Sequence, residues 1–249
     1  MKKRLIPALL AVLLLALSGC GSRYRQLDVP KEMKIDPASL SENTDNLMDS
    51  GEKTPLLAAL PEEGLYVYAT DPTIQSGVLV KYDGLLQFFP WSFTPQLAQP
   101  ELYAADYNGD GKKDIAFVYV SSSGSTQRRE NLHVLLRGEK GFEDNFYPCE
   151  KAALEANGRL SVSNPEKNSY IVLCGSEQQT FTMEGHDGFK GLYFDDWQDF
   201  TLGETISVTL RPGMVFDGEA LPVYDAFTYT ADIEFVNGLL SQTDPAVTF

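Results

Sequence analysis

Short runs in which apolar and polar residues alternate make up most of the chain after residue 60. Alternation with a period of two is typical of a strand that buries one face. Alternating runs and short apolar runs predict strands at 64–70, 77–89, 114–120, 130–138, 140–147, 159–163, 169–174, 179–183, 204–210 and 226–242. Turn signals recur at intervals of roughly 8–12 residues, as in antiparallel sheets. The pattern therefore predicts a mainly β fold, sandwich-like or partly propeller-like, with one or two short helices.

Two dipeptides place turns inside the longer runs, and two segments have a helical pattern. Asp83-Gly84 and Asn237-Gly238 suit the positive φ angles of a type I′ turn, so each predicts a hairpin. Residues 150–158 predict the best helix, which we expect to end at Asn157-Gly158. Leu56–Leu60 predicts a single helical turn before Pro61.

The first nineteen residues have the pattern of an export signal. Three basic residues at positions 2–4 precede an almost entirely apolar run from Leu5 to Leu17, and small residues follow. A bilayer-spanning helix needs about 20 apolar residues, so this run is too short to span a membrane. We therefore predict that residues 1–19 are a signal peptide.

The segment Leu17-Ser18-Gly19-Cys20 resembles the lipobox of bacterial lipoproteins, in which the cysteine becomes the lipidated first residue. The resemblance implies that Cys20 anchors the mature chain to the cell membrane on its extracytoplasmic face. Two or three acyl chains would hold it firmly, because each buried CH₂ contributes about 0.8 kcal/mol. Residues 20–55 are polar and show no useful period, so we predict a flexible tether there. Residues 56–249 are then the β-rich globular domain.

Acidic residues outnumber basic residues along the chain. There are 35 Asp and Glu against 20 Lys and Arg, a net charge of −15. Removing residues 1–19 takes three basic residues away and lowers the net charge from −15 to −18. So acidic a surface repels phosphate backbones, and the mature chain has no basic run longer than two residues to offset it. The composition therefore excludes nucleic acid as a partner and suits cations.

Two cysteines remain once Cys20 is set aside. Outside the cytoplasm, Cys149 and Cys174 could pair as a disulfide. Closing a loop of about 26 residues would add roughly 3.5 kcal/mol in the chain-entropy description. The alternative is two buried free thiols, and the sequence leaves both alternatives open.

The densest group of candidate metal ligands lies in "DYNGDGKKD", residues 106–114. Its oxygen donors are the side chains of Asp106, Asn108, Asp110 and Asp114 and the carbonyl of Lys112. Calcium takes six to eight hard oxygen ligands at about 2.3–2.6 Å, and Gly111 at the sixth position permits the sharp turn such a loop needs. The spacing predicts a calcium site. A solvated Asp/Asn/Gly turn is the alternative.

The loop differs from an EF-hand, which would place Glu where this chain has Phe117. It resembles the FG-GAP or VCBS-type repeat, D-x-(D/N)-x-D-G-x-x-(D/E) before an apolar strand, known from α-integrin propeller blades and bacterial surface proteins. With "SGVLVKYDGLLQFFPW" and "YTADIEFVNGLL", it also resembles single-copy VCBS lipoproteins of the Firmicutes type. The resemblance implies structural calcium between two strands and implies no particular activity.

A second acidic group lies in "LYFDDWQDF", residues 192–200. Asp195, Asp196 and Asp199 surround Trp197, and paired carboxylates beside an aromatic ring occur in glycosidases and sugar-binding sites. An acidic surface turn with a half-buried tryptophan is the commoner alternative. Trp91 is predicted to lie in the core. The sequence contains no zinc motif, nucleophile elbow or phosphate-binding loop, so no motif supports catalysis.

These observations lead to three functional hypotheses. The leading one is a lipid-anchored, calcium-binding surface protein whose β domain binds a carbohydrate or a surface protein, as an adhesion or envelope-associated module. The first alternative is a cell-envelope glycan hydrolase that uses Asp195, Asp196 or Asp199. The second alternative is a purely structural envelope lipoprotein.

Overall fold

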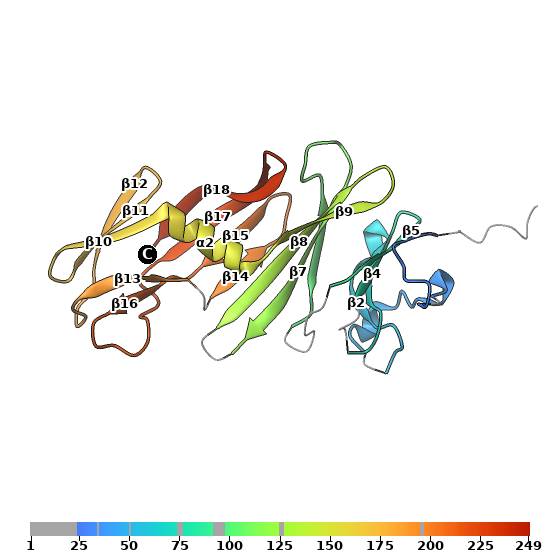
Figure 1. Ribbon diagram of the computed structural model, residues 1–249, viewed down its shortest axis with the longest axis horizontal. Helices are drawn as coiled ribbons and strands as arrows, with labels where there is room; N and C mark the ends of the chain where they lie inside the picture. Colours follow the sequence, from blue (N-terminus) through green and yellow to red (C-terminus); the bar gives the residue numbers. More distant parts are fainter. Residues whose placement is uncertain are drawn as a thin grey trace, which may run out of the picture.

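The computed structural model describes residues 24–33, 35–49, 51–73, 77–91, 98–124, 127–194 and 197–249. This part of the chain is mainly β, with 53% strand, one α-helix and several mostly antiparallel sheets, none of them closed. The sheets follow one another along an elongated body (Figure 1). The predicted fold class, mainly β with antiparallel sheets, is confirmed.

The N-terminal sheet has five strands in the order β1-β5-β4-β3-β2. They are β1 (Arg25–Leu27), β2 (Leu56–Leu60), β3 (Leu65–Ala69), β4 (Val78–Tyr82) and β5 (Leu85–Phe89). Neighbouring strands are antiparallel, except that β1 runs parallel to β5. Asp83 and Gly84 have φ of 47° and 70° between β4 and β5, so the predicted hairpin is confirmed.

The central sheet is an antiparallel meander in the order β6-β7-β8-β9. Its strands are β6 (Glu101–Ala105), β7 (Asp114–Ser123), β8 (Arg128–Arg137) and β9 (Phe142–Tyr147). Alternate residues of β7 enter different cores: Ile115 and Phe117 pack with the N-terminal sheet, whereas Ala116 and Val118 pack with the C-terminal part. Because both faces of β7 are buried, its sequence is a continuous apolar run.

The C-terminal part consists of the single described helix, α2 (Cys149–Arg159), and three further sheets. The first sheet comprises β10 (Leu160–Glu166), β11 (Ser169–Cys174) and β12 (Glu177–Thr182). The second pairs β13 (Phe189–Tyr193) with β16 (Gly213–Phe216). The third, the C-terminal sheet, comprises β14 (Gln198–Thr201), β15 (Ile206–Leu210), β17 (Thr228–Val236) and β18 (Leu239–Thr248), in that order. Asn237 and Gly238 have φ of 53° and 80°, which confirms the second predicted hairpin.

Helix α2 packs onto the C-terminal core through one face. Its buried residues are Cys149, Ala152, Ala153 and Ala156. The helix was expected to end at Asn157-Gly158, but it continues to Arg159, and the N–H of Leu160 still donates to the Ala156 carbonyl. Neither Asn157 nor Gly158 has a positive φ, so this dipeptide stays helical instead of forming a left-handed cap.

The prediction of a helical turn at Leu56–Leu60 is wrong, because this segment is strand β2. Leu57 enters the core shared with the central sheet, whereas Leu56 packs on the opposite, outer face of the N-terminal sheet. Burial on both faces explains an apolar run that shows no period of two. The helical turn instead begins at Pro61, as the 3₁₀-helix η3 (Pro61–Glu63).

Within the segment predicted as a flexible tether, residues 20–55, the described residues form short elements that contact the N-terminal sheet. Strand β1 pairs with β5, and the short 3₁₀-helices η1 (Pro37–Ser39) and η2 (Thr44–Asn46) follow it. Leu40 is buried against the outer face of the N-terminal sheet, with Ile35 and Leu47 packed around it. The segment has no period because it is built of a short strand and single turns, so its apolar residues reach the sheet at irregular intervals.

A buried lysine holds the N-terminal segment in place. The side chain of Lys81 on β4 is 5% exposed, and its Nζ lies 2.6 Å from the Glu42 carboxylate. The same ammonium lies 4.8 Å from the ring centroid of Tyr24 and 5.8 Å from that of Tyr66. A desolvated charge of this kind needs a partner, so Glu42 and the two rings together stabilise the segment against the sheet.

Besides β1 and β2, four short strands were not predicted from the sequence: β6, β13, β14 and β16. Each has only four or five residues; β6 and β14 lie at the edges of four-stranded sheets, and β13 and β16 pair only with each other in a sheet of two strands. Across the described residues, no helix has the length and apolar character needed to span a membrane.

Candidate functional site

Loop 106–113 joins β6 to β7 and closes a β-hairpin. Ala105 and Asp114 are paired at its base. Gly109 and Gly111 have φ of 76° and 82°, a region that residues with a side chain rarely adopt. These two glycines therefore let the loop fold back sharply between its strands.

Asp106 orders this loop through backbone amides. Its Oδ1 accepts from the N–H of Gly109 at 2.8 Å and of Asp110 at 3.1 Å, and its Oδ2 accepts from Gly111 at 2.8 Å. The Asn108 side chain accepts a second bond from the Asp110 N–H at 2.9 Å. Three of the five predicted ligands, Asp106, Asn108 and Asp110, thus lie in one turn.

Asp114 is the buried member of the set. Its carboxylate accepts from the N–H of Arg137 at 2.7 Å and from that of Tyr107 at 3.1 Å. Burial raises the pKa of Asp114, the two N–H donors lower it, and the nearby charges of Asp110 and Asp106 raise it further. Asp114 therefore ties the loop to the end of β8, at the cost of holding a carboxylate out of water.

Asp110 and the two lysines lie on the outer side of the loop. The Asp110 carboxylate accepts from the Lys112 N–H at 2.9 Å and lies 3.3 Å from the Lys112 ammonium. The Lys112 N–H is the main cause that lowers the pKa of Asp110. Lys113 turns away and forms an ion pair with Glu63. Asp110 is therefore an exposed, ionised oxygen donor.

The donor chemistry of the loop fits calcium, because the five predicted ligands offer only oxygen atoms. The structure brings Asp106, Asn108 and Asp110 into one exposed turn and places Asp114 at its base. Their oxygens bind amides, however, and among the described residues no three His, Cys, Asp or Glu side chains converge as a metal-holding group. The calcium site therefore stays a prediction.

Tyr107 is a residue of the loop whose role the ligand spacing does not predict. Its hydroxyl donates to the carbonyl of Gly203 at 2.9 Å, in the turn between β14 and β15. Burial raises the pKa of Tyr107, so the phenol stays protonated. The contact joins residues 96 apart in sequence, which is why no local pattern announces it.

The second acidic group is only partly described. Asp195 and Asp196 lie outside the described residues. Asp199 accepts from the Trp197 indole N–H at 2.6 Å and lies 2.7 Å from Nε of Arg128. The guanidinium of Arg211 covers the Trp197 ring at 4.8 Å. Asp199 is thus engaged in a structural ion pair rather than held free as a base.

Trp91 lies in the core, as predicted, with 7% of its surface exposed. Its ring stacks on His133 at 4.0 Å, and Asp144 accepts from both Trp91 Nε1 at 2.7 Å and His133 Nδ1 at 2.8 Å. Phe146 covers the other face of His133 at 4.5 Å. The imidazole is therefore enclosed within the sheet and serves packing.

Cys149 and Cys174 are both buried and both free, so the structure has the second of the two alternatives left open by the sequence. Burial raises the pKa of the Cys149 thiol to about 11 and also raises that of Cys174. Both thiols therefore stay protonated at neutral pH and are poor nucleophiles.

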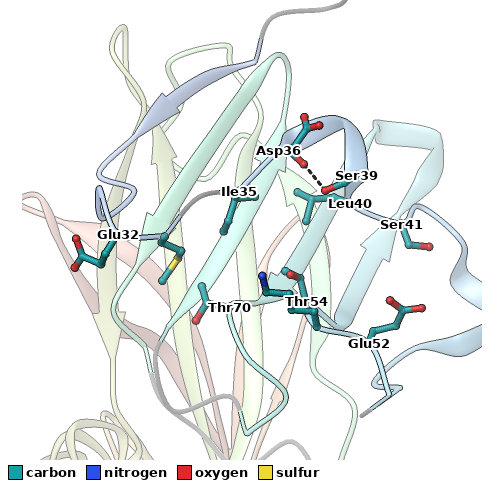
Figure 2. Close-up of a pocket in the computed structure, with 11 residues that line it drawn as sticks. Glu32, Ile35, Asp36, Ser39, Leu40, Ser41, Glu52, Thr54 and Thr70 are labelled. Atoms are coloured by element: carbon teal, nitrogen blue, oxygen red, sulfur yellow. Dashed lines mark hydrogen bonds between the residues drawn. The ribbon is translucent and has the colours of Figure 1, made fainter.

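A pocket of about 480 Å³ opens where the N-terminal segment crosses the end of the N-terminal sheet (Figure 2). Its lining residues are Glu32, Met33, Ile35, Asp36, Ser39, Leu40, Ser41, Glu52, Lys53, Thr54 and Thr70. The sequence does not predict this pocket, because its walls come from three stretches that carry no motif.

Comparison with known proteins identifies no relative. No known protein family, no curated protein and no solved structure matches the chain.

Proposed function

We propose that the protein is a lipid-anchored, calcium-binding module on the extracytoplasmic face of the cell membrane, whose β domain binds a carbohydrate or a surface protein. One observation carries the proposal: residues 106–114 place three aspartates and an asparagine in the turn of a single hairpin and at its base. The lipobox-like segment before Cys20 supports the location, and the net charge of −15 suits cations.

Asp106, Asn108, Asp110, the Lys112 carbonyl and Asp114 would hold the ion. Calcium would supply the positive charge that offsets repulsion among carboxylates, about 1 kcal/mol per pair at 4 Å even in water. Asp114 also accepts from the N–H of Arg137 at the end of β8. An ordered loop would therefore stabilise the pairing of β7 with β8. The role proposed for calcium is structural.

Thermal melting of the mature protein in calcium and in EGTA tests the site. With calcium about 10- to 100-fold above Kd, we expect stabilisation by roughly 1.5–3 kcal/mol and a rise in Tm of roughly 4–10 °C. Asp110→Ala should remove this rise, because it deletes an exposed ligand without opening the core. Asp187→Ala, which deletes an exposed carboxylate elsewhere, should keep it. A wild-type Tm that is equal in calcium and EGTA would contradict the site.

Detergent phase partitioning tests the anchor separately. Full-length protein expressed in a bacterium should enter the detergent phase, and Cys20→Ser should leave it in the aqueous phase or unprocessed. Glycan arrays probed with the soluble domain in calcium then decide between a carbohydrate and a protein partner. Equal partitioning of both forms would contradict lipidation at Cys20.

A further inference from the structure

The pocket on the N-terminal segment has walls that the fold holds in place. They come from residues 32–33, 35–36 and 39–41, from residues 52–54 and from Thr70, which directly follows β3. Leu40 is 7% exposed and packs on the sheet, and the Lys81–Glu42 ion pair fixes the chain immediately after the pocket residue Ser41. The volume of about 480 Å³ lies in the range of small-molecule pockets.

Acidic side chains outnumber basic ones among the described residues that line the pocket. Its lining includes three carboxylates, Glu32, Asp36 and Glu52, against one ammonium, Lys53. No hydrogen bond or ion pair in the described part of the chain engages the Glu32 or Glu52 carboxylates, whereas Asp36 caps the N–H of Ala38 at 3.0 Å. Figure 2 shows Glu32 and Glu52 on opposite sides of the pocket. The site therefore attracts cations and repels anions.

An apolar surface lies between these carboxylates. Met33, Ile35 and Leu40 contribute it, and Ile35 and Leu40 lie near the middle of the view in Figure 2. A bare metal ion would leave this surface unused. Among the lining residues there is no aromatic ring, so a sugar would find no platform on which to stack.

We propose that this pocket binds a small organic cation, an ammonium group attached to a short apolar chain. The ammonium pairs with the free carboxylates of Glu32 or Glu52, and the carbon chain covers Met33, Ile35 and Leu40. Hydroxyl groups at the wall, such as that of Thr54, accept the remaining hydrogen bonds from the ammonium group. The inference goes beyond the proposed function and uses none of the residues of loop 106–114, so either one can fail alone.

Calorimetric titration with three probes of one carbon skeleton tests the ligand class. Hexane-1,6-diamine should bind the mature protein with a Kd in the millimolar range or below, and more weakly as salt rises. Hexane-1,6-diol and adipate should bind at least about tenfold more weakly, because they lack the positive charge. No binding of the diamine, or equal binding of the diol, would overturn the proposal.

Four substitutions separate the pocket from the general acidity of the chain. Glu32→Gln and Glu52→Gln should each weaken diamine binding by about threefold to tenfold, and Lys53→Met should strengthen it. Glu234→Gln removes an exposed charge on distant β17 and should change nothing. All four side chains are exposed, and a melting curve checks that each variant folds. If Glu234→Gln weakens binding as much as the pocket variants, the attraction is not local and the proposal is wrong.

Discussion

Glu130 shows how one buried carboxylate can join two sheets. It lies on β8 with a side chain that is 4% exposed and pairs with Arg128. Its Oε2 accepts from the N–H of Phe200 on β14 at 2.7 Å. Burial raises the pKa of Glu130, and the Phe200 N–H and the Arg128 guanidinium partly counter this rise. The fold therefore needs this carboxylate for its contacts but holds it at an electrostatic disadvantage when it is ionised.

This disadvantage predicts a pH dependence for the Glu130→Gln variant. Because the folded pKa is raised, the stabilising contribution of Glu130 titration is fully present below the unfolded pKa, near 4.5. It is lost as the pH rises through the raised folded pKa. The free energy of unfolding of wild type minus that of Glu130→Gln should therefore fall as the pH rises above about 4.5. Urea denaturation at a series of pH values measures this difference, and a difference that stays constant or rises with pH would contradict the prediction.

At the scale of elements, hydrogen bonds from buried polar groups hold helix α2 against strand β18. Glu155 accepts from the N–H of Gln242 at 2.7 Å and from the Tyr147 hydroxyl at 3.0 Å. The Gln242 side chain is buried and donates to the Ala152 carbonyl at 2.8 Å, while it accepts from Tyr229 at 2.6 Å. The network fixes the position of the helix along the strand, which apolar packing alone leaves free to slide.

Glu155→Ala should destabilise the protein by about 2–4 kcal/mol, because it leaves the Gln242 N–H and the Tyr147 hydroxyl without their acceptor in a buried region. Chemical denaturation followed by circular dichroism measures the change. Glu150→Ala, on the exposed side of the same helix, should cost at most about 1 kcal/mol. Equal losses for the two variants would show that Glu155 acts only through helix propensity.

The elements that the sequence predicts well are those specified by neighbouring residues. Asp83-Gly84 and Asn237-Gly238 predict their hairpins because the turn geometry depends on these residues alone. The segment 24–49 could not be predicted in the same way, since β1 pairs with β5 about 60 residues later. The short strands β13 and β16 likewise could not be predicted locally, because they pair with each other although β14 and β15 lie between them in the sequence.

The candidate site follows the same division. The spacing of Asp106, Asn108 and Asp110 predicts one tight turn, and the structure forms it through bonds that span two to five residues. The burial of Asp114 could not be predicted, because it depends on an amide 23 residues away. Nor could the pocket be predicted, because it forms only once the N-terminal segment is folded against the sheet.

At the scale of the whole molecule, the central sheet belongs to both halves. One face of β7 and β8 enters the core with the N-terminal sheet, and the other enters the core with α2 and the C-terminal sheet. Gln87 strengthens the first junction, since its buried amide group accepts from the Phe142 N–H at 2.8 Å and donates to the Phe142 carbonyl at 3.0 Å. Neither half can lose its core without exposing one face of the shared sheet.

The shared sheet predicts a single unfolding transition. The chain has two tryptophans, Trp91 in the core shared with the N-terminal sheet and Trp197 beside the C-terminal sheet, so Trp91→Phe and Trp197→Phe each leave one fluorescent reporter. In each variant, the urea midpoint measured by tryptophan fluorescence should equal the midpoint measured by circular dichroism. Leu65→Ala leaves a cavity in the N-terminal core and should lower the free energy of unfolding by about 2–5 kcal/mol. If the halves unfold together, the urea midpoints of both reporters should fall. A shift of the Trp91 reporter alone would show that the halves unfold independently.

The docked N-terminal segment changes how far the protein can stand from a bilayer. Only three residues separate Cys20 from Tyr24, where the described structure begins. Even fully extended, four steps of chain span only about 14 Å. With a lipid on Cys20, the domain would therefore rest on the membrane by its N-terminal end, and a partner would reach it from the side or from the far end rather than from beneath.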